Sequence, residues 1–197
     1  MNNIEHYREF IKEVLHNYYK VSDKSIEQLI TNAKIRHLEK GKLLLSVGER
    51  ARHIYFLFQG SVVSCYLNNE GKLYHKNIFL EGNIVGSIVS LLNNQPSNFS
   101  LETIEKSILI EINYSKYKQL INENIDFKNF YISYLERNWV IDKEKREIDI
   151  ILKEAKDRYI DFIRTHPDIE NRIALQYIAS HLGITPTQLS RIRKKMK

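Results

Sequence analysis

The sequence has few of the cysteine and histidine patterns that bind metals and iron–sulfur clusters. A single cysteine, Cys65, excludes an internal disulfide and a four-thiolate iron–sulfur cluster. The seven histidines show no metal-ligand spacing. No run of apolar residues reaches the ~18 that a membrane span needs, and the first residues have no secretion-signal core. We therefore expect a cytoplasmic protein without a cofactor, a metal site or a membrane partner.

Acidic residues are missing from one end of the chain. Residues 171–197 contain six Lys or Arg and no Asp or Glu. The whole chain has 30 basic and 24 acidic residues, so the rest is neutral and the net charge of +6 belongs to this segment. Such an end attracts a polyanion. A lysine-rich terminus can also be a solvated tail, and the residue pattern inside the segment decides between the two.

That pattern predicts two short helices joined by a tight turn. Apolar residues at three- and four-residue spacing indicate the first helix, and Gly183 supplies the left-handed turn that ends it. Thr185, Pro186 and Gln188 have the order of an N-cap, a first-turn proline and a capping box. Helix, turn and capped helix make a helix-turn-helix, so we expect residues 185–196 to be a recognition helix in the major groove of DNA.

The solvent side of the second helix supplies the candidate DNA contacts. An arginine side chain can hydrogen-bond to a guanine edge, a glutamine can hydrogen-bond to an adenine edge, and a threonine can pack on a thymine methyl group. The candidate base contacts are therefore Arg191, Gln188 and Thr187. Hydroxyl and cationic side chains also hold phosphates and set the register on the duplex. The candidate phosphate contacts are Thr185, Ser190, Arg193, Lys194 and Lys195.

The middle of the chain has the composition of a β-structure. Six of the seven glycines lie between Gly41 and Gly86, and the short runs between them are rich in β-branched and aromatic residues. Regular short strands with turn residues between them predict a sandwich or barrel. The predicted strands are Lys42–Val47, Ile54–Phe58, Ser61–Leu67, Leu73–Phe79 and Ser107–Ile112, with a hairpin turn at 68–71.

Residues 125–153 contain no glycine or proline and predict a helix about 40 Å long. Its alternating three- and four-residue spacing is typical of a dimer seam, although a core helix of a monomer is the alternative. A homodimer suits DNA binding, because two recognition helices read more base pairs than one. The predicted seam residues are Tyr131, Tyr134, Asn138, Ile141, Ile148 and Leu152.

The order of these parts resembles the Crp/Fnr family of bacterial transcription regulators. The resemblance rests on residues 54–62 (IYFLFQGSV), 82–86 (GNIVG) and the basic segment 175–195. It implies an α+β fold in three parts. These are an N-terminal helix with a jelly-roll β-barrel of the cyclic-nucleotide-binding kind over 1–124, a dimerisation helix over 125–153 and a helix-turn-helix domain over 154–197. It also implies a homodimer on double-stranded DNA, with RNA polymerase and an unidentified small-molecule effector as further candidate partners.

The resemblance also implies a ligand pocket, with Gly82, Val85, Gly86, Ser87, Ser97 and Asn98 as the candidate residues. Cyclic-nucleotide-binding members have a glutamate where this chain has Ser87, and an Arg-Ser or Arg-Thr pair near the position of Ser97. No Lys, Arg or His occurs from residue 77 through 105. Losing a charge-assisted phosphate contact costs roughly 1.5–3 kcal/mol, so we expect that the barrel does not bind cyclic AMP in the family's usual way.

Two other functions compete with transcription regulation. One is a small-molecule-binding barrel that acts through protein partners without specific DNA binding. The other is an enzyme with a cupin-like barrel, which needs a metal cluster or a nucleophile beside a base. The sequence shows neither arrangement, so we expect no catalytic residues and no enzymatic activity.

Overall fold

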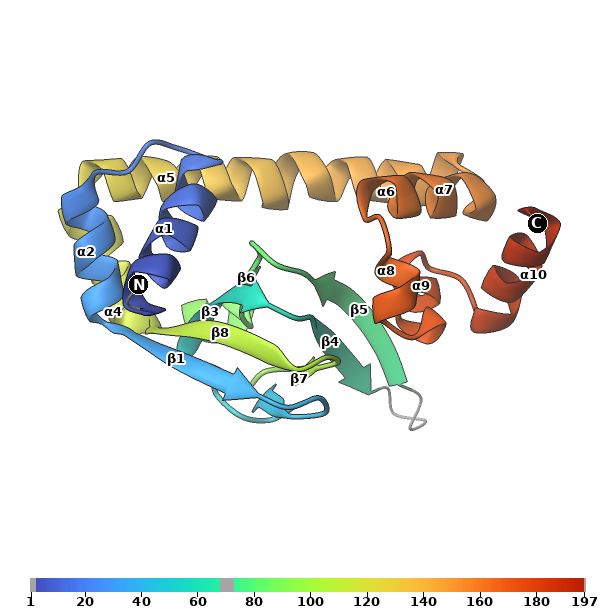
Figure 1. The fold of residues 1–197 in the computed structure, drawn as a ribbon, viewed down its shortest axis with the longest axis horizontal. Coiled ribbons are helices and arrows are strands. Elements are labelled where there is room, and N and C mark those ends of the chain that lie inside the picture. The colour runs from blue at the N-terminus through green and yellow to red at the C-terminus, as the bar shows by residue number, and fades with distance from the viewer. Residues whose placement is uncertain (1–2, 68–72, 197) are drawn as a thin grey trace.

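The computed structural model describes residues 3–67 and 73–196 and has three parts (Figure 1). Two β-sheets form the centre, helices α1 and α2 lie at one end, and helices α7 to α10 lie at the other. A long helical segment, α5–η1–α6, spans both ends above the sheets (Figure 1). The helices are α1 (Asn3–His16), α2 (Asp23–Thr31), α3 (Ile88–Asn93), α4 (Tyr114–Glu123), α5 (Ile125–Leu135), the π-helix η1 (Glu136–Ile141), α6 (Asp142–Leu152), α7 (Ala155–Thr165), α8 (Ile169–Arg172), α9 (Leu175–His181) and α10 (Pro186–Met196).

The sheets are antiparallel and form a jelly-roll sandwich, so the α+β prediction is confirmed, although the roll is not a closed barrel. One sheet has the strand order β1-β8-β3-β6 and the other β2-β7-β4-β5. The strands are β1 (Ala33–Leu38), β2 (Leu43–Leu45), β3 (His53–Gln59), β4 (Val62–Leu67), β5 (Leu73–Phe79), β6 (Ile84–Val85), β7 (Ser100–Thr103) and β8 (Ser107–Asn113).

The five predicted strands are all present, with β2 shorter than expected and β5 as predicted. Strands β1, β6 and β7 were not foreseen, because they are short or carry charged side chains at alternate positions. The predicted hairpin turn at 68–71 lies outside the described residues.

Alternation along β3 separates two apolar cores. Tyr55 and Leu57 point between the sheets, where they meet Leu45, Leu101 and Leu109. The intervening β3 residues, Ile54 and Phe56, point outward to the helices. This is the period of two that a strand buried on both faces requires.

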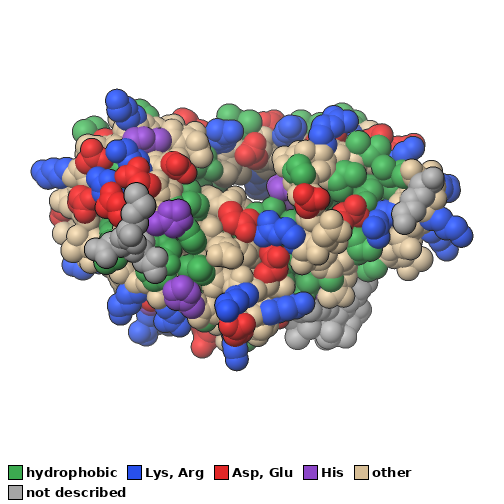
Figure 2. Space-filling model, in the orientation of Figure 1, with side chains coloured by type: hydrophobic (Ala, Val, Ile, Leu, Met, Phe, Trp, Pro, Cys, Tyr) green, Lys and Arg blue, Asp and Glu red, His purple; other side chains and the backbone are tan. Residues whose placement is uncertain are grey.

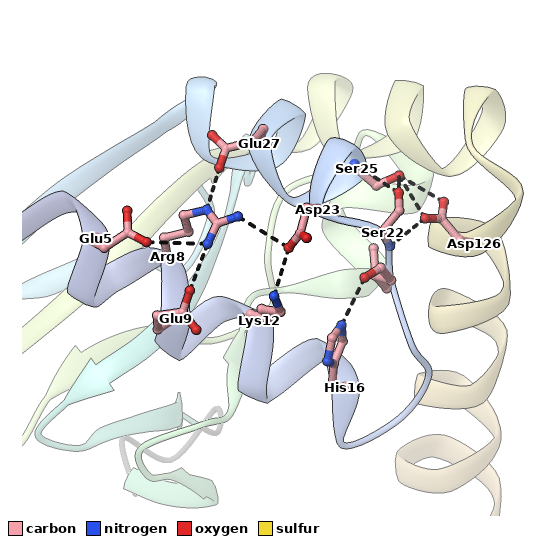
Figure 3. A network of polar contacts seen from close by, with 11 residues as sticks. Glu5, Arg8, Glu9, Lys12, His16, Ser22, Asp23, Ser25, Glu27 and Asp126 are labelled. Carbon is pink, nitrogen blue, oxygen red and sulfur yellow. Dashed lines mark hydrogen bonds and ion pairs between the residues drawn. The ribbon is translucent and has the colours of Figure 1, made fainter.

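Helices α1 and α2 are fastened to α5 by polar contacts (Figure 3). Arg8 of α1 contacts Glu27 and, at 3.3 Å, Asp23 of α2. The Ser22 amide and the Ser25 hydroxyl donate to Asp126 of α5 at 2.8 and 2.9 Å. Burial alone would raise the pKa of Asp126, but these hydrogen bonds outweigh it and hold the pKa below its usual range. The long helix is thus anchored at the end of the molecule that carries α1 and α2.

Candidate nucleic-acid interface and sensor cavity

The turn between α9 and α10 has the hydrogen bonds of a Schellman motif. Gly183 takes a φ of +71°, and its amide donates to the Ser180 carbonyl at 3.1 Å. The Ile184 amide donates to the Ala179 carbonyl at 3.0 Å. These two bonds satisfy carbonyls that the helix end would otherwise leave unpaired. The predicted glycine turn is therefore present.

The start of α10 is a reciprocal capping box. The Thr185 amide donates to Gln188 Oε1 at 2.8 Å, and the Gln188 amide donates to Thr185 Oγ1 at 3.1 Å. Pro186 is the first residue of the helix. The N-cap, the proline and the glutamine thus have the local roles that the sequence predicted.

The inner sides of α9 and α10 close a small apolar core with α7 and α8. Ala179 and Leu189 are fully buried where α9 and α10 meet. Tyr159 and Phe162 of α7 and Ile169 of α8 complete this core. Because the apolar side of α10 is used in this way, its opposite side faces solvent.

Most of the predicted DNA contacts lie on that solvent side. Lys and Arg side chains are visible at this end of the molecule, as they are on other parts of the same face (Figure 2). None of the predicted base-contact residues is packed inside the subunit, as the helix-turn-helix hypothesis requires. The exposed residues of α10 include Thr187, Gln188, Ser190, Arg191, Lys194 and Lys195.

Three of the predicted contacts have internal partners that the sequence did not reveal. Gln188 Oε1 accepts from both the amide and the hydroxyl of Thr185, so this oxygen and the Thr185 hydroxyl proton are used within the cap rather than on a base or a phosphate. Half-buried Arg193 pairs with Glu170 at 2.8 Å, and Glu170 also accepts the Tyr159 hydroxyl at 2.5 Å. Through Glu170, Arg193 fastens α10 to α7 and α8. The sequence did not reveal this role, because Glu170 and Arg193 come within reach of each other only in the folded domain.

The helix-turn-helix domain is docked on the outer face of the β4/β5 side of the roll. Val63 and Ile104 of the roll share an apolar cluster with Ile173 and Ile178. At the margin, Arg172 contacts Glu81 at 2.7 Å and Glu105 at 3.0 Å. The roll and the helix-turn-helix domain are therefore joined by a common core as well as by the long helix.

The long helix does not present the whole predicted seam to solvent. Tyr134 packs its ring edge-on against Tyr18 at 5.2 Å, and Tyr18 also donates to Asn138 at 3.4 Å. Tyr131 contacts Tyr117 of α4, so the first half of the predicted seam packs within its own chain. The π-helix η1 rotates the following residues relative to a regular helix. The exposed apolar residues of the segment are Ile125, Ile132, Trp139, Val140, Ile141, Ile148, Ile150, Ile151 and Leu152.

A cavity of about 430 Å³ opens at the end of the roll, but it is not where the resemblance implies a pocket. Of the six candidate pocket residues, only Ser87 lines it. Ser97 is buried with its hydroxyl 2.9 Å from that of Ser87, Val85 is in the sheet core, and Asn98 is exposed. Gly82 forms a turn with a φ of +84°, and Gly86 packs near Ile54.

The walls of this cavity come mainly from the segment that leads into β3. The lining residues are Leu44, Leu45, Glu49, Arg50, Ala51, Arg52, His53, Tyr55, Ser87 and Leu101. Cations are thus present in the roll, although residues 77–105 contain none. The sequence interpretation missed them because it considered only the segment that the resemblance singled out. The alternating Arg50 and Arg52 before a strand were the available signal.

The described part of the chain shows neither a metal site nor a reactive thiol. It contains no group of three His, Cys, Asp or Glu side chains placed to hold a metal ion. Burial raises the pKa of Cys65 to about 11, which keeps this thiol protonated and unreactive. Among the described residues, no helix has both the length and the apolar character that crossing a membrane requires.

The geometry defines a class of protein: a jelly-roll domain joined by a long helix to a C-terminal helix-turn-helix. Residues 35–124 match the family model of the cyclic nucleotide-binding domain. The cAMP-activated global transcriptional regulator CRP of Salmonella typhimurium is 24% identical over 188 residues, covering 89% of this chain and 88% of that protein. Over most of its length the chain is similar to transcription regulators of the Crp/Fnr family.

Solved structures show the same fold. The c-di-GMP responsive global regulator CLP of Xanthomonas campestris superposes with a TM-score of 0.66 at 17% identity, covering 89% of this chain and 91% of that one. DNR of Pseudomonas aeruginosa gives a TM-score of 0.61 at 21% identity, covering 100% of this chain and 89% of that one.

Proposed function

We propose that the protein binds specific double-stranded DNA sites as a homodimer, with α10 in the major groove. The observation that carries the proposal is the capped, glycine-terminated pair α9–α10, which leaves Thr187, Arg191 and Lys194 exposed on a helix rich in cations. A helix of this kind reads bases from its exposed side while its flanking cations hold phosphates.

Selection from a random DNA pool, followed by anisotropy titrations, tests the proposal. We expect one enriched palindromic site whose affinity falls steeply with salt, because binding releases counterions from the phosphates. Lys116→Ala in α4 also removes one exposed cation. It is the matched control for Lys194→Ala in α10, and it should leave the affinity for DNA unchanged. Equal binding to random and selected duplexes would favour the alternative of a barrel that acts through protein partners.

The proposed dimer surface is the exposed apolar stripe of η1 and α6, centred on Val140, Ile141 and Ile148. These side chains are 58%, 59% and 46% exposed. Ile141 and Ile148 are seven residues apart, and exposed apolar side chains at this spacing on a long helix suit a two-helix contact. The residues that pack within their own chain, Tyr131 and Tyr134, set the position of the helix.

Sedimentation tests the dimer directly. Ile141→Glu should shift the protein toward the monomer and weaken DNA binding in parallel. Leu43→Glu provides the control, because Leu43 is 54% exposed in β2 and lies away from the long helix. A monomeric wild-type protein that binds its selected site tightly would contradict the dimer.

The proposal also holds that cyclic AMP is not bound in the family's usual way. The Ser87 and Ser97 hydroxyls pair with each other in a buried position. Neither provides the carboxylate or guanidinium that the ribose and phosphate contacts use in cyclic-nucleotide-binding members. Calorimetric titration with cyclic AMP and cyclic GMP should show no micromolar binding, and micromolar binding of either would overturn this part.

A further inference from the structure

The cavity at the end of the roll carries unpaired positive charge. The exposed Arg50 and Arg52 both line it, and no ion pair engages either guanidinium within residues 3–67 and 73–196. Each guanidinium presents a fork of donors that matches a carboxylate or a phosphate. Two such groups around one concave surface create a local positive potential.

The acidic residue of the cavity does not neutralise these arginines. Glu49 Oε2 accepts the Ser46 amide at 2.7 Å, and hydrogen bonding from Ser46 holds the pKa of Glu49 below its usual value. This carboxylate is therefore ionised and turned to the backbone. The cavity retains an excess of positive charge.

The segment that carries the arginines is held in place on both sides. The Gly48 amide donates to the Ser97 carbonyl at 2.8 Å, and the Ser97 amide donates to the Glu49 carbonyl at 2.7 Å. The Ala51 amide donates to Ser90 Oγ at 3.0 Å. Because the backbone of this segment is already fixed, little conformational entropy is lost when the segment binds a ligand.

The remaining walls are apolar or neutral. Leu44, Leu45 and Leu101 supply an aliphatic surface, and Ser87 supplies a hydroxyl. Tyr55 is buried, which raises the pKa of its phenol to about 12, so the hydroxyl remains a hydrogen-bond donor at neutral pH. A volume of about 430 Å³ lies in the range of small-molecule sites.

We propose that this cavity binds a small organic anion, with its carboxylate or phosphate on Arg50 and Arg52 and its apolar body against Leu44, Leu45 and Leu101. The site lies apart from the positions that the family resemblance implies, since only Ser87 is shared. Binding here does not depend on the DNA-binding proposal, so each can fail without the other.

Phenyl phosphate and benzoate are the probes, titrated into the full-length protein by calorimetry. Saturable binding of at least one of them is expected, and the one that binds assigns the head group as phosphate or carboxylate. Neutral benzyl alcohol lacks the anionic head group, and inorganic phosphate lacks the apolar body. Each should therefore bind at least threefold more weakly than the aromatic anion that binds. No saturable binding of either aromatic anion at millimolar concentration would overturn the proposal.

Variants locate the site. Arg50→Gln combined with Arg52→Gln should weaken probe binding roughly tenfold, the usual effect of losing a charge-assisted contact. Lys34→Gln combined with Lys116→Gln removes the same charge from exposed positions of β1 and α4 and should leave probe binding unchanged. Unaltered binding in the arginine variant, or an equal loss in the lysine variant, would overturn the assignment.

Arginine labelling gives a second, site-resolved measurement that does not depend on a variant folding. The bound probe should protect Arg50 and Arg52 of the wild-type protein from phenylglyoxal and leave Arg191 reactive, as read by peptide mass spectrometry. Protection of Arg191 without protection of Arg50 and Arg52 would place the anion on the recognition helix and refute the cavity.

Discussion

The Ser180 hydroxyl bridges both backbone groups of His75, accepting from its amide and donating to its carbonyl, each at 3.0 Å. Ser180 belongs to α9, and His75 belongs to β5, which is an edge strand of its sheet. The helix-turn-helix domain therefore satisfies backbone groups that an edge strand would otherwise expose. The His75 ring also packs against Tyr177 of α9, with centroids 4.6 Å apart.

Ser180→Ala should loosen the docking of the helix-turn-helix domain on the roll. The His75 amide and carbonyl lose their partner, which costs about 1–3 kcal/mol when such groups stay buried. We expect faster hydrogen exchange at the His75 amide, measured by NMR. Ser190→Ala on the exposed side of α10 is the control, and it should leave this exchange rate unchanged.

Gly183→Ala should destabilise the turn between α9 and α10. A side chain at a φ of +71° is strained by about 1–2 kcal/mol, and no atom lies within 4 Å of the added Cβ, so strain is the whole effect. Gly183→Asn should cost less, because asparagine tolerates the left-handed region. Urea denaturation measures both changes, and equal stability of all three proteins would refute the role of the turn.

Arg191→Ala and Lys194→Ala should affect DNA binding in different ways. Loss of a base contact costs about 1–3 kcal/mol at one base pair of the selected site and relaxes specificity there. Loss of a phosphate contact weakens all sequences alike and lowers the salt slope by about one. Anisotropy titrations on the selected site and its single-base variants distinguish the two, and a neutral Arg191 change would show that the register is wrong.

His181 should make the stability of the folded protein depend on pH. Burial first, then the nearby positive charges of Arg146 and His166, lower the pKa of His181 to about 3. The unfolded chain binds a proton near pH 6.5 and the folded chain does not, so stability falls as the pH drops from 6.5 toward 3. The loss between pH 7 and pH 5 is about 2 kcal/mol.

Urea midpoints at the two pH values measure this loss. His181→Gln should remove most of the difference, because glutamine does not titrate. His37→Gln, at an exposed position of β1, should leave the difference unchanged. A wild-type protein as stable at pH 5 as at pH 7 would contradict the buried, neutral state of His181.

Local patterns in the sequence were sufficient to locate α10 and the turn that precedes it. Gly183, Thr185, Pro186 and Gln188 act through bonds within a few residues of themselves, so the order of residue types specifies the turn and the cap. The partner of Arg193 was not visible in this way. Glu170 is distant in sequence, and only the packing of α8 against α10 brings it into contact.

The same limit applies to the sensor end. Glycine spacing and β-branched runs predicted a sandwich or barrel, but the short strands β6 and β7 owe their existence to neighbouring strands. The cavity is formed by the segment before β3, which the fold brings beside Ser87 and Leu101. Arg50 and Arg52 of this cavity were therefore missed, because the sequence interpretation considered only residues 77–105.

The sequence by itself determined the periodic and capped elements of this protein and the concentration of positive charge at one end, because these depend on neighbours along the chain. Tertiary structure alone decided which side of the long helix stays exposed, which cations of α10 remain free and where a cavity opens. Those outcomes depend on contacts between distant segments, and the free energy of such contacts is set only when the segments pack together.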